Sequence, residues 1–221
     1  MNLNIKNRLQ KIYKNSWFIT LFATTLGVLL AFYLNNINSR SKIEVRKQIS
    51  IQNLNNEITK NKSELLDSKD NEKLIDFLNE IRKINNDIPN DLTLSTKAME
   101  KLKNKYSGFI EIRDSTNVHI DYYSYNIVYK FELDLDDIQN IAWETSKMSD
   151  ITNEFNYDCL HALVKIYSLQ EIFTNEQQKL LSHFVNAEHN KLLSALRIVQ
   201  QLKTQLLIIM VEGQNQIKGC D

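Results

Sequence analysis

Arg113 and His119, six positions apart, are the residues whose types and spacing come closest to a recognisable chemistry. A guanidinium holds phosphate, and an imidazole transfers protons near neutral pH, so such a pair could cleave RNA at a 2′-hydroxyl. To act on one phosphate, the two side chains would have to be held close together. The residues between them, "DSTNV", form helices poorly, and the flanking sequence alternates like strands. We therefore expect no nuclease site at this position.

The same pair resembles the R-x4-6-H motif of HEPN ribonucleases, in which both side chains project from the start of a helix. The resemblance keeps one alternative function open, a membrane-associated effector of the antiviral type. Such an effector would be either a HEPN-like ribonuclease or a membrane-perturbing oligomer. The ribonuclease would need Arg113 and His119 in the cytoplasm.

The histidines and cysteines show no spacing typical of a metal or nucleophile site. No two of the four histidines are four residues apart, as a helical metal site would require; they are His119, His161, His183 and His189. Cys159 and His161 are two residues apart and would face different sides of a helix. Cys159 is expected to be a small core residue and Cys220 to lie in a frayed tail, with no disulfide framework. We expect no catalytic residue, metal or cofactor.

Two further groups of residues could bind a ligand but have simpler structural roles. Asp134, Asp136 and Asp137 precede an expected helix, where carboxylates cap the first turn. Trp143 and Glu144 could line a pocket, although tryptophan at a helical core position more often packs. The site prediction therefore lies elsewhere, in the elements that position the chain.

Residues 17–34, "WFITLFATTLGVLLAFYL", contain no charge in a chain that is 24% charged. Eighteen residues make roughly 27 Å of helix, which is close to the hydrocarbon thickness of a bilayer. Tyr13, Trp17, Phe18, Phe32 and Tyr33 place aromatic rings at both ends, as at membrane interfaces. No small-x-small cleavage site follows directly, so we expect an uncleaved, single-pass anchor.

The charges on either side of this segment indicate its orientation. The preceding tail carries Lys6, Arg8, Lys11 and Lys14 with no acid, and the far flank carries Arg40, Lys42, Arg46 and Lys47. Lys14 lies nearer to the apolar segment than Arg40 does. The positive-inside rule then favours a cytoplasmic N-terminus, with the rest of the chain outside.

Ala23, Gly27 and Ala31 follow one another at intervals of four and share one side of the expected helix. Small residues on one stripe let membrane helices approach closely, and the hydroxyls of Thr20 and Thr24 on the same side could bond across the contact. The stripe is the predicted oligomer interface within the membrane.

The composition indicates one mainly helical domain outside the bilayer. Only one proline and four glycines interrupt the chain, and 27 basic residues balance 27 acidic ones. This balance gives no general basic surface for nucleic acid, so we expect none as a partner. The expected partners are the lipid bilayer and further copies of the chain, with an envelope protein as a further candidate.

We predict a mainly α fold with a small β-rich insertion. Its parts are a basic tail (1–16), a transmembrane helix (17–34), a stalk helix and helical hairpin (35–107), a β-rich insertion (108–135), a helical region packing on the stalk (136–212) and a tail (213–221). Within the helical parts we expect helices at 41–67, 71–85, 96–106, 136–147, 157–173 and 175–212, the last stopped by Gly213. "DSTN" at 114–117 is the expected hairpin turn, with alternation at 127–135 indicating a strand.

Apolar stripes on the stalk and on the last helix match one another. The stalk carries Ile51, Leu54, Ile58 and Leu65, and the last helix carries Leu192, Ala195, Val199, Leu202, Leu206 and Ile209. Two such stripes would favour aggregation if both stayed exposed. We expect them to pack antiparallel, with positions 54 and 206 facing one another.

"LGVLLAFYLNN" after a basic tail, followed later by "IAWETSK" and "IYSLQEIF", resembles a broad family of uncharacterised bacterial single-pass membrane proteins. That family joins such a span to a helical domain with A-W-E/Q-T-A-like and I-Y-x-x-Q-like segments. The chain departs from it in the β-rich part and at Ser146. The resemblance implies architecture and location but no activity. We therefore expect a non-catalytic, membrane-anchored module for oligomerisation or interaction in the bacterial envelope.

Overall fold

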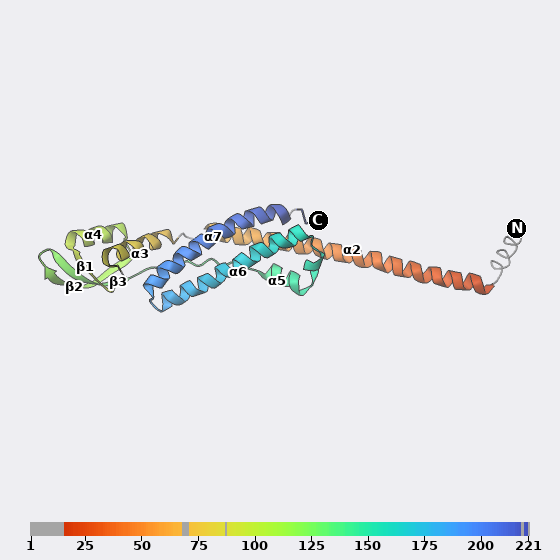
Figure 1. Ribbon diagram of the computed structural model, residues 1–221, viewed down its shortest axis with the longest axis horizontal. Helices are drawn as coiled ribbons and strands as arrows, with labels where there is room; N and C mark the ends of the chain where they lie inside the picture. The colour runs from red at the N-terminus through yellow and green to blue at the C-terminus, as the bar shows by residue number, and fades with distance from the viewer. Residues whose placement is uncertain (1–15, 68–70, 87, 218, 221) are drawn as a thin grey trace.

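A computed structural model describes residues 16–67, 71–86, 88–217 and 219–220. The molecule is mainly helical, with one three-stranded antiparallel sheet at the end farthest from the N-terminus (Figure 1). The predicted fold class is confirmed. Residues 1–15 of the predicted basic tail lie outside the described residues. They include Lys6, Arg8, Lys11, Tyr13 and Lys14.

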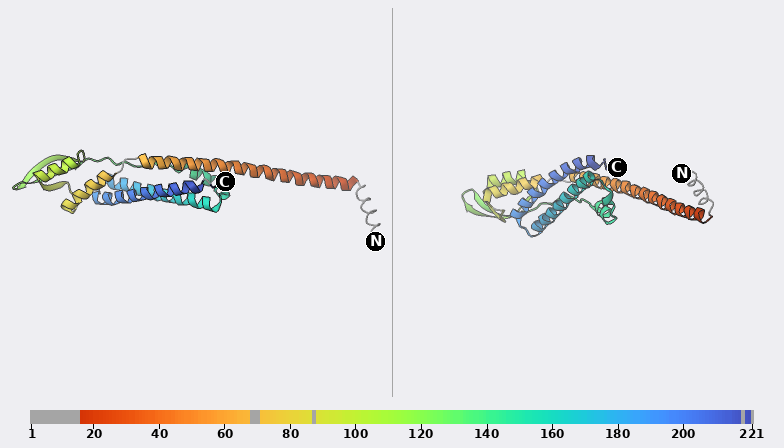
Figure 2. Two further views of the ribbon diagram at one scale, coloured as in Figure 1. Left: turned by 90° about the horizontal axis from the view of Figure 1, so that it is seen from above. Right: turned by 45° about the vertical axis from the view of Figure 1, so that its right-hand side comes forward.

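Helix α2 (Ser16–Asp67) is the longest element and has two differently placed halves. Its first half projects alone from the molecule, and its second half lies along the bundle (Figures 1 and 2). The predicted transmembrane helix and stalk helix are thus one continuous helix. In the second half, Leu54, Ile58 and Leu65 are buried, as their spacing predicts.

Helices α6 (Tyr157–Val185) and α7 (His189–Ile217) form an antiparallel hairpin against α2. Gln214 of α7 donates to Thr59 Oγ1 at 2.7 Å, and Lys62 Nζ donates to Gln214 at 3.0 Å. Nearer the start of α7, Arg197 donates to Asn79 of helix α3 (Glu72–Asn85). The antiparallel direction agrees with the expectation. The pairing of 54 with 206 is wrong, because α7 runs past the end of α2 and onto α3.

The hairpin of α6 and α7 breaks at a place that the sequence did not indicate. The prediction put a break near 174 and a last helix from 175 to 212, whereas α6 continues to Val185 and α7 to Ile217. Ala187 adopts a left-handed φ of 54°, which reverses the chain without glycine or proline. The predicted break was wrong because no residue type there signals it.

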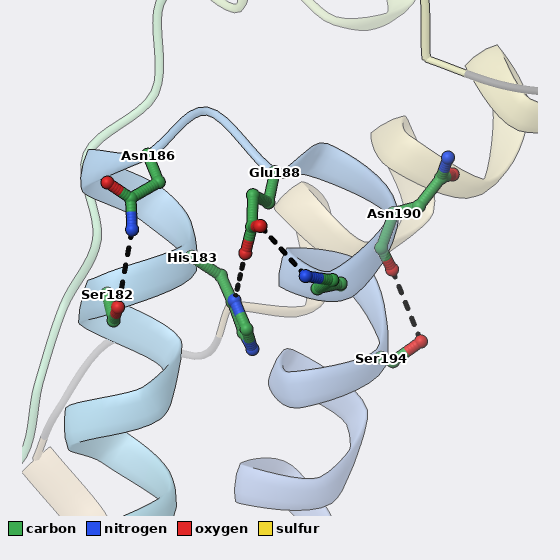
Figure 3. Close-up of polar contacts among 7 residues, drawn as sticks. Ser182, His183, Asn186, Glu188, Asn190 and Ser194 are labelled. Carbon is green, nitrogen blue, oxygen red and sulfur yellow. Dashed lines mark hydrogen bonds and ion pairs between the residues drawn. The ribbon is translucent and has the colours of Figure 1, made fainter.

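Polar contacts close the turn between these helices (Figure 3). His183 Nδ1 lies 2.6 Å from Glu188 Oε2, and Lys191 Nζ donates to Glu188 Oε1 at 2.8 Å. The hydrogen bond from Lys191, and then that from His183, lowers the pKa of Glu188 below its ordinary value. Asn186 and Ser182 bond beside them at 3.4 Å. Glu188 therefore links the last turn of α6 to the first of α7.

Gly213 does not stop the last helix. It lies buried inside α7, where an added Cβ would be 2.5 Å from Ile166 Cδ1 on α6. A distance under 3.0 Å is one that real Cβ atoms essentially never show. The glycine is used for a close approach of two helices, and the prediction that it ends the helix was wrong.

The sheet has the order β1-β3-β2, formed by β1 (Asp91–Ser95), β2 (Ile110–His119) and β3 (Tyr122–Tyr129). The turn between β2 and β3 lies at Ile120 and Asp121, where Asp121 has φ 63°. The predicted turn at 114–117 falls inside β2 and is wrong, and β1 was not predicted. The alternation at 127–135 ends as strand at Tyr129, and the chain then continues without regular structure to Asn140.

Helix α4 (Thr96–Lys105) connects β1 to β2 along the chain, and it begins where the sequence predicted. The Ser95 side chain accepts a hydrogen bond from Ala98 N at 3.3 Å. Phe77 of α3 is fully buried beneath the sheet, with the Tyr106 ring at 5.2 Å and the Phe109 ring at 5.3 Å. Aromatic packing thus attaches the β-rich insertion to the helices.

Cys159 and Cys220 are joined by a disulfide. The bond ties the start of α6 to the residues after α7, across a separation of 61 positions. Cys159 is buried, as expected, but Cys220 is buried too and does not lie in a frayed tail. The spacing of two lone cysteines could not predict this pairing, because it depends on α6 and α7 being antiparallel.

Candidate functional site

Two of the three segments on which the family resemblance rests meet at one place in the structure. Helix α5 (Ile141–Met148) presents Trp143, and α6 presents Tyr167. Their rings stack with centroids 5.0 Å apart and planes inclined by 3°. Both side chains are buried. The "AWET" and "IYSLQ" segments are therefore two halves of one contact.

Glu57 of α2 joins that contact to the stalk. Its Oε1 accepts from the Tyr167 hydroxyl at 2.7 Å, and its Oε2 accepts from Ala142 N at 2.7 Å. The second bond caps the first turn of α5, whose N-cap residue Asn140 makes no side-chain cap. Burial, and then the hydrogen bond to Glu57, raises the pKa of Tyr167 far above its ordinary value. Tyr167 thus remains a neutral donor to a buried carboxylate.

A second polar cluster lies one turn of α2 farther along and continues the contacts of Glu57. Asn61 Nδ2 donates to Gln139 O at 2.6 Å, and Gln139 N donates to Asn61 Oδ1 at 2.9 Å. Gln170 Nε2 donates to the same carbonyl at 2.7 Å. We call these contacts and those of Glu57 the "stalk joint", comprising Glu57, Asn61, Gln139, Ala142, Trp143, Tyr167 and Gln170. The stalk joint satisfies buried polar groups of three elements at once.

The acidic residues at 134–137 do not cap α5, which begins later than predicted, at Ile141. Asp136 instead pairs with Lys203 of α7, with 3.4 Å between Oδ1 and Nζ and both side chains buried. Ser146, where the resemblance departs from its pattern, makes a short hydrogen bond of 2.5 Å with Ser50 of α2. These polar residues also fasten helices to one another.

Trp143 and Glu144 do line a hollow, of about 490 Å³, beside the stalk joint. Two of its charged groups are paired with each other, because Lys147 Nζ lies 2.8 Å from Glu144 Oε1. Lys147 also lies over the Trp143 ring, 5.5 Å from its centroid. A ligand stacking on the indole would have to displace Tyr167 or Lys147, so the contacts favour a packing role.

The candidate ribonuclease pair is not brought together. Arg113 and His119 both belong to β2, a strand, where six residues span roughly 20 Å. His119 lies at the turn end of the strand, and Arg113 instead lines a hollow of about 400 Å³ with His189. The helix start that the HEPN arrangement requires is not present at this position. Within the part of the chain that the structure describes, no group of three or more metal-ligating side chains forms either.

The predicted membrane interface lies on the first half of α2. Ala23, Gly27 and Ala31 are all exposed, and an added Cβ at Gly27 would meet nothing within 4 Å. The hydroxyls of Thr20 and Thr24 donate to the carbonyls one turn earlier, Ser16 O and Thr20 O, each at 2.9 Å. They are satisfied inside their own helix, and bonding across a helix contact is not needed for that.

Among the residues that the structure describes, two helices are long and apolar enough to cross a membrane by length and composition. One is α2, none of whose apolar window is buried, and the other is α7, part of which is buried in the bundle. The apolar character of α7 is accounted for by its packing in the core of the bundle. The exposed apolar segment near the N-terminus has the character of a membrane span or signal sequence.

Comparison with known proteins gives no relative. No protein-family model matches the chain, no curated protein matches it, and no solved structure matches it. The resemblance to uncharacterised single-pass membrane proteins therefore remains a prediction.

Sequence reasoning missed the residues that α2 contributes to the stalk joint. Glu57 and Asn61 are polar but lie on the buried side of α2, between Leu54 and Leu65. A charge placed one residue before Ile58 of an apolar stripe is the signal that could have indicated a buried partner.

Proposed function

We propose that this chain is a membrane-anchored, non-catalytic helical module for oligomerisation or interaction in the bacterial envelope. Residues 17–34 cross the inner membrane once as an uncleaved anchor, and the helical bundle is held outside by the stalk. The observation that carries the proposal is the continuity of α2, from an uncovered apolar segment to buried Leu54 and Ile58. Lipid is the environment that would cover the first half.

The disulfide supports the orientation. Cys159 and Cys220 are the only cysteines of the chain and are paired. Disulfides persist outside the cytoplasm and are rare inside it. This agrees with the charge argument for a cytoplasmic N-terminus, to which Lys14 contributes most.

The stalk joint supports a structural task for the bundle. Glu57, Asn61 and Ser50 fix α2 to α5 and α6 through polar contacts that allow one geometry. A stalk held in this way transmits the position of the anchor to the bundle. The outer domain then presents its surface at a set height above the membrane, as an interaction module requires.

A topology experiment tests the proposal. Full-length chain is fused after residue 221 either to alkaline phosphatase, which is active only outside the cytoplasm, or to a fluorescent protein that matures only inside it. We expect phosphatase activity without fluorescence, and membrane material that resists carbonate extraction. Fluorescence without phosphatase activity would overturn the orientation, and full release by carbonate would overturn the anchor.

Self-association through the membrane stripe is part of the proposal. Gly27→Ile places a β-branched side chain between Ala23 and Ala31 and would hold neighbouring backbones apart. We expect a smaller species than wild type in detergent, measured by light scattering during size exclusion. Leu29→Ile, away from the stripe, is the control; an unchanged size for Gly27→Ile would mean that the stripe faces lipid.

A further inference from the structure

One face of α2 points away from the bundle, and a row of uncharged residues follows it from the membrane segment well into the stalk. We call it the uncharged seam; its members are Thr20, Ala23, Gly27, Ala31, Leu34, Asn38, Ser41, Val45, Ile49, Gln52 and Asn56. Successive members are three or four residues apart, which keeps them on one side of an α-helix. All of them are exposed. Leu54, Glu57 and Ile58 mark the opposite, buried side.

The part of this seam beyond the membrane segment has an unusual composition for a solvated helix face. Val45 and Ile49 are each 53% exposed, although neither contributes to the bundle core. Lys42, four residues after Asn38 and three before Val45, is the one charge close to the seam; it lies along one edge with Arg46 beyond it, and Glu44 lies along the other edge. An exposed helix normally carries its charges on the face that is farthest from the core. On α2 that face is mainly apolar or neutral, with Lys42 at its margin.

We propose that the uncharged seam packs along its length against the same seam of a second copy of this chain, with the two α2 helices parallel. The inference rests on the proposed membrane anchoring, because two anchors inserted in the same direction can only run parallel. It extends the contact from Ala23, Gly27 and Ala31 to Val45, Ile49 and Asn56. The two bundles then lie on the outer sides of the helix pair.

Charge complementarity favours a second copy as the occupant. In a two-fold parallel pair, one edge of each helix meets the opposite edge of the other. Lys42 and Arg46 would then face Glu44 of the second copy. Within its own chain, Glu44 pairs with Lys47 at 3.8 Å through Oε1 and remains 52% exposed, so it is accessible to a further cation.

The seam also predicts the crossing angle of the pair. A contact limited to the small residues of the membrane segment would cross at about 40° and separate the stalks. Members that continue at intervals of three and four residues instead keep two nearly parallel helices in contact. Contact at Val45 and Asn56 is therefore what separates this inference from a contact in the membrane alone.

Single cysteines in the full-length chain, in native membranes, test the inference through oxidative crosslinking. The native disulfide leaves no free thiol of its own. Asn38→Cys, Val45→Cys and Asn56→Cys place thiols on the seam. Asn36→Cys is the matched control. Asn36 is an exposed asparagine like Asn38, but it points about 200° away from Asn38 around the helix. We expect disulfide-linked dimers from the three seam variants and none from Asn36→Cys.

The outcomes separate the inference from the proposed function. Dimers from Asn38→Cys alone would mean helices that cross in the membrane and diverge, which overturns the extended seam. Equal dimer formation from Asn36→Cys, or none from any variant in protein that resists carbonate extraction, would overturn the inference and leave the anchor intact. Protein recovered in the soluble fraction would overturn the anchor, and the inference with it.

Discussion

The two halves of α2 have the same backbone and opposite surroundings. In the second half, Leu54, Ile58 and Leu65 are fully or almost fully buried, and Glu57 and Asn61 have partners on α5, on α6 and in the segment before α5. In the first half, Trp17 is 68% exposed and Phe32 is 69% exposed. Regular helical geometry therefore says nothing about what stabilises each half. The second half depends on packing within the chain, and the first on what surrounds it.

The difference makes the two halves respond differently to the same change. A charge introduced on the buried side of the second half enters the bundle core. A charge introduced in the first half, beyond the apolar segment, stays exposed at the surface. The comparison can thus be tested by matched substitutions, which are ordered below by the size of the expected loss of unfolding free energy.

Leu54→Asp should have the largest effect, because it buries an unpaired carboxylate at a fully buried position. We expect a loss of about 4 kcal/mol or more, enough to unfold the bundle. Ile37→Asp, in the first half, 48% exposed and outside the uncharged seam, is the control and should change the free energy by less than about 0.5 kcal/mol. Circular dichroism during thermal unfolding in detergent measures both. Equal destabilisation by the two variants would contradict the division of α2.

Breaking the disulfide should destabilise the bundle and leave the first half of α2 unaffected. The bond closes a loop across 61 positions, and the chain entropy of such a loop corresponds to about 4 kcal/mol, with strain and residual structure lowering the observed value to about 2–4 kcal/mol. Cys159→Ala with Cys220→Ala should lower the thermal midpoint, and reductant should lower it for wild type alone. A midpoint that reductant does not change in wild type would argue that the pairing is absent in solution.

Glu57→Ala should be costly because it leaves Ala142 N and the Tyr167 hydroxyl without their acceptor. We expect a loss of about 2–3 kcal/mol. Glu57→Gln retains an acceptor oxygen and should cost less, while Tyr167→Phe should cost about 1 kcal/mol. Thermal unfolding gives the order of the three variants. A Glu57→Gln variant as unstable as Glu57→Ala would show that the charge, rather than the hydrogen bonds, is what α5 requires.

Gly213→Ala and Gly27→Ala are the mildest test, because each adds one methyl group to α7 or α2. At Gly213 the methyl group would meet Ile166 Cδ1 at 2.5 Å, and we expect a loss of about 1–2 kcal/mol. At Gly27 nothing lies within 4 Å, so the bundle should be unchanged. Chemical denaturation monitored by Trp143 fluorescence compares them. A loss at Gly27 of equal size would mean that the first half of α2 is coupled to the bundle.

The sequence predicted what repeats and missed what depends on a single position. The stripes of α2 and α7 and the Ser95 cap follow from side-chain periodicity and local hydrogen bonding, so the mainly helical fold could be derived. The turn at Ala187 could not, since nothing in its residue type indicates a left-handed φ. Gly213 looks like a helix stop, and only the neighbouring Ile166 shows another use. Local patterns do not contain the distances between elements.

The candidate site was predicted in part for the same reason. The segments containing Trp143 and Tyr167 were recognised, and the structure brings them together. Their partner Glu57 lies more than eighty residues away in the chain, and no short-range rule connects it to α5. The pairing of Asp136 with Lys203 was likewise hidden, because a lysine in an apolar stripe has no visible partner until the helices are packed.

The position of α7 across both α2 and α3 has a consequence for the order of synthesis. Residues 1–188 leave the ribosome before α7 does, so the faces of α2 and α3 that α7 contacts must wait for the last helix to cover them. Chains are synthesised at roughly 5–20 residues per second, which leaves these surfaces open for seconds. Cys159 likewise emerges before Cys220, so their bond forms only once both ends of the α6–α7 hairpin are outside the ribosome. Covering the stalk is therefore a late step in the assembly of the bundle.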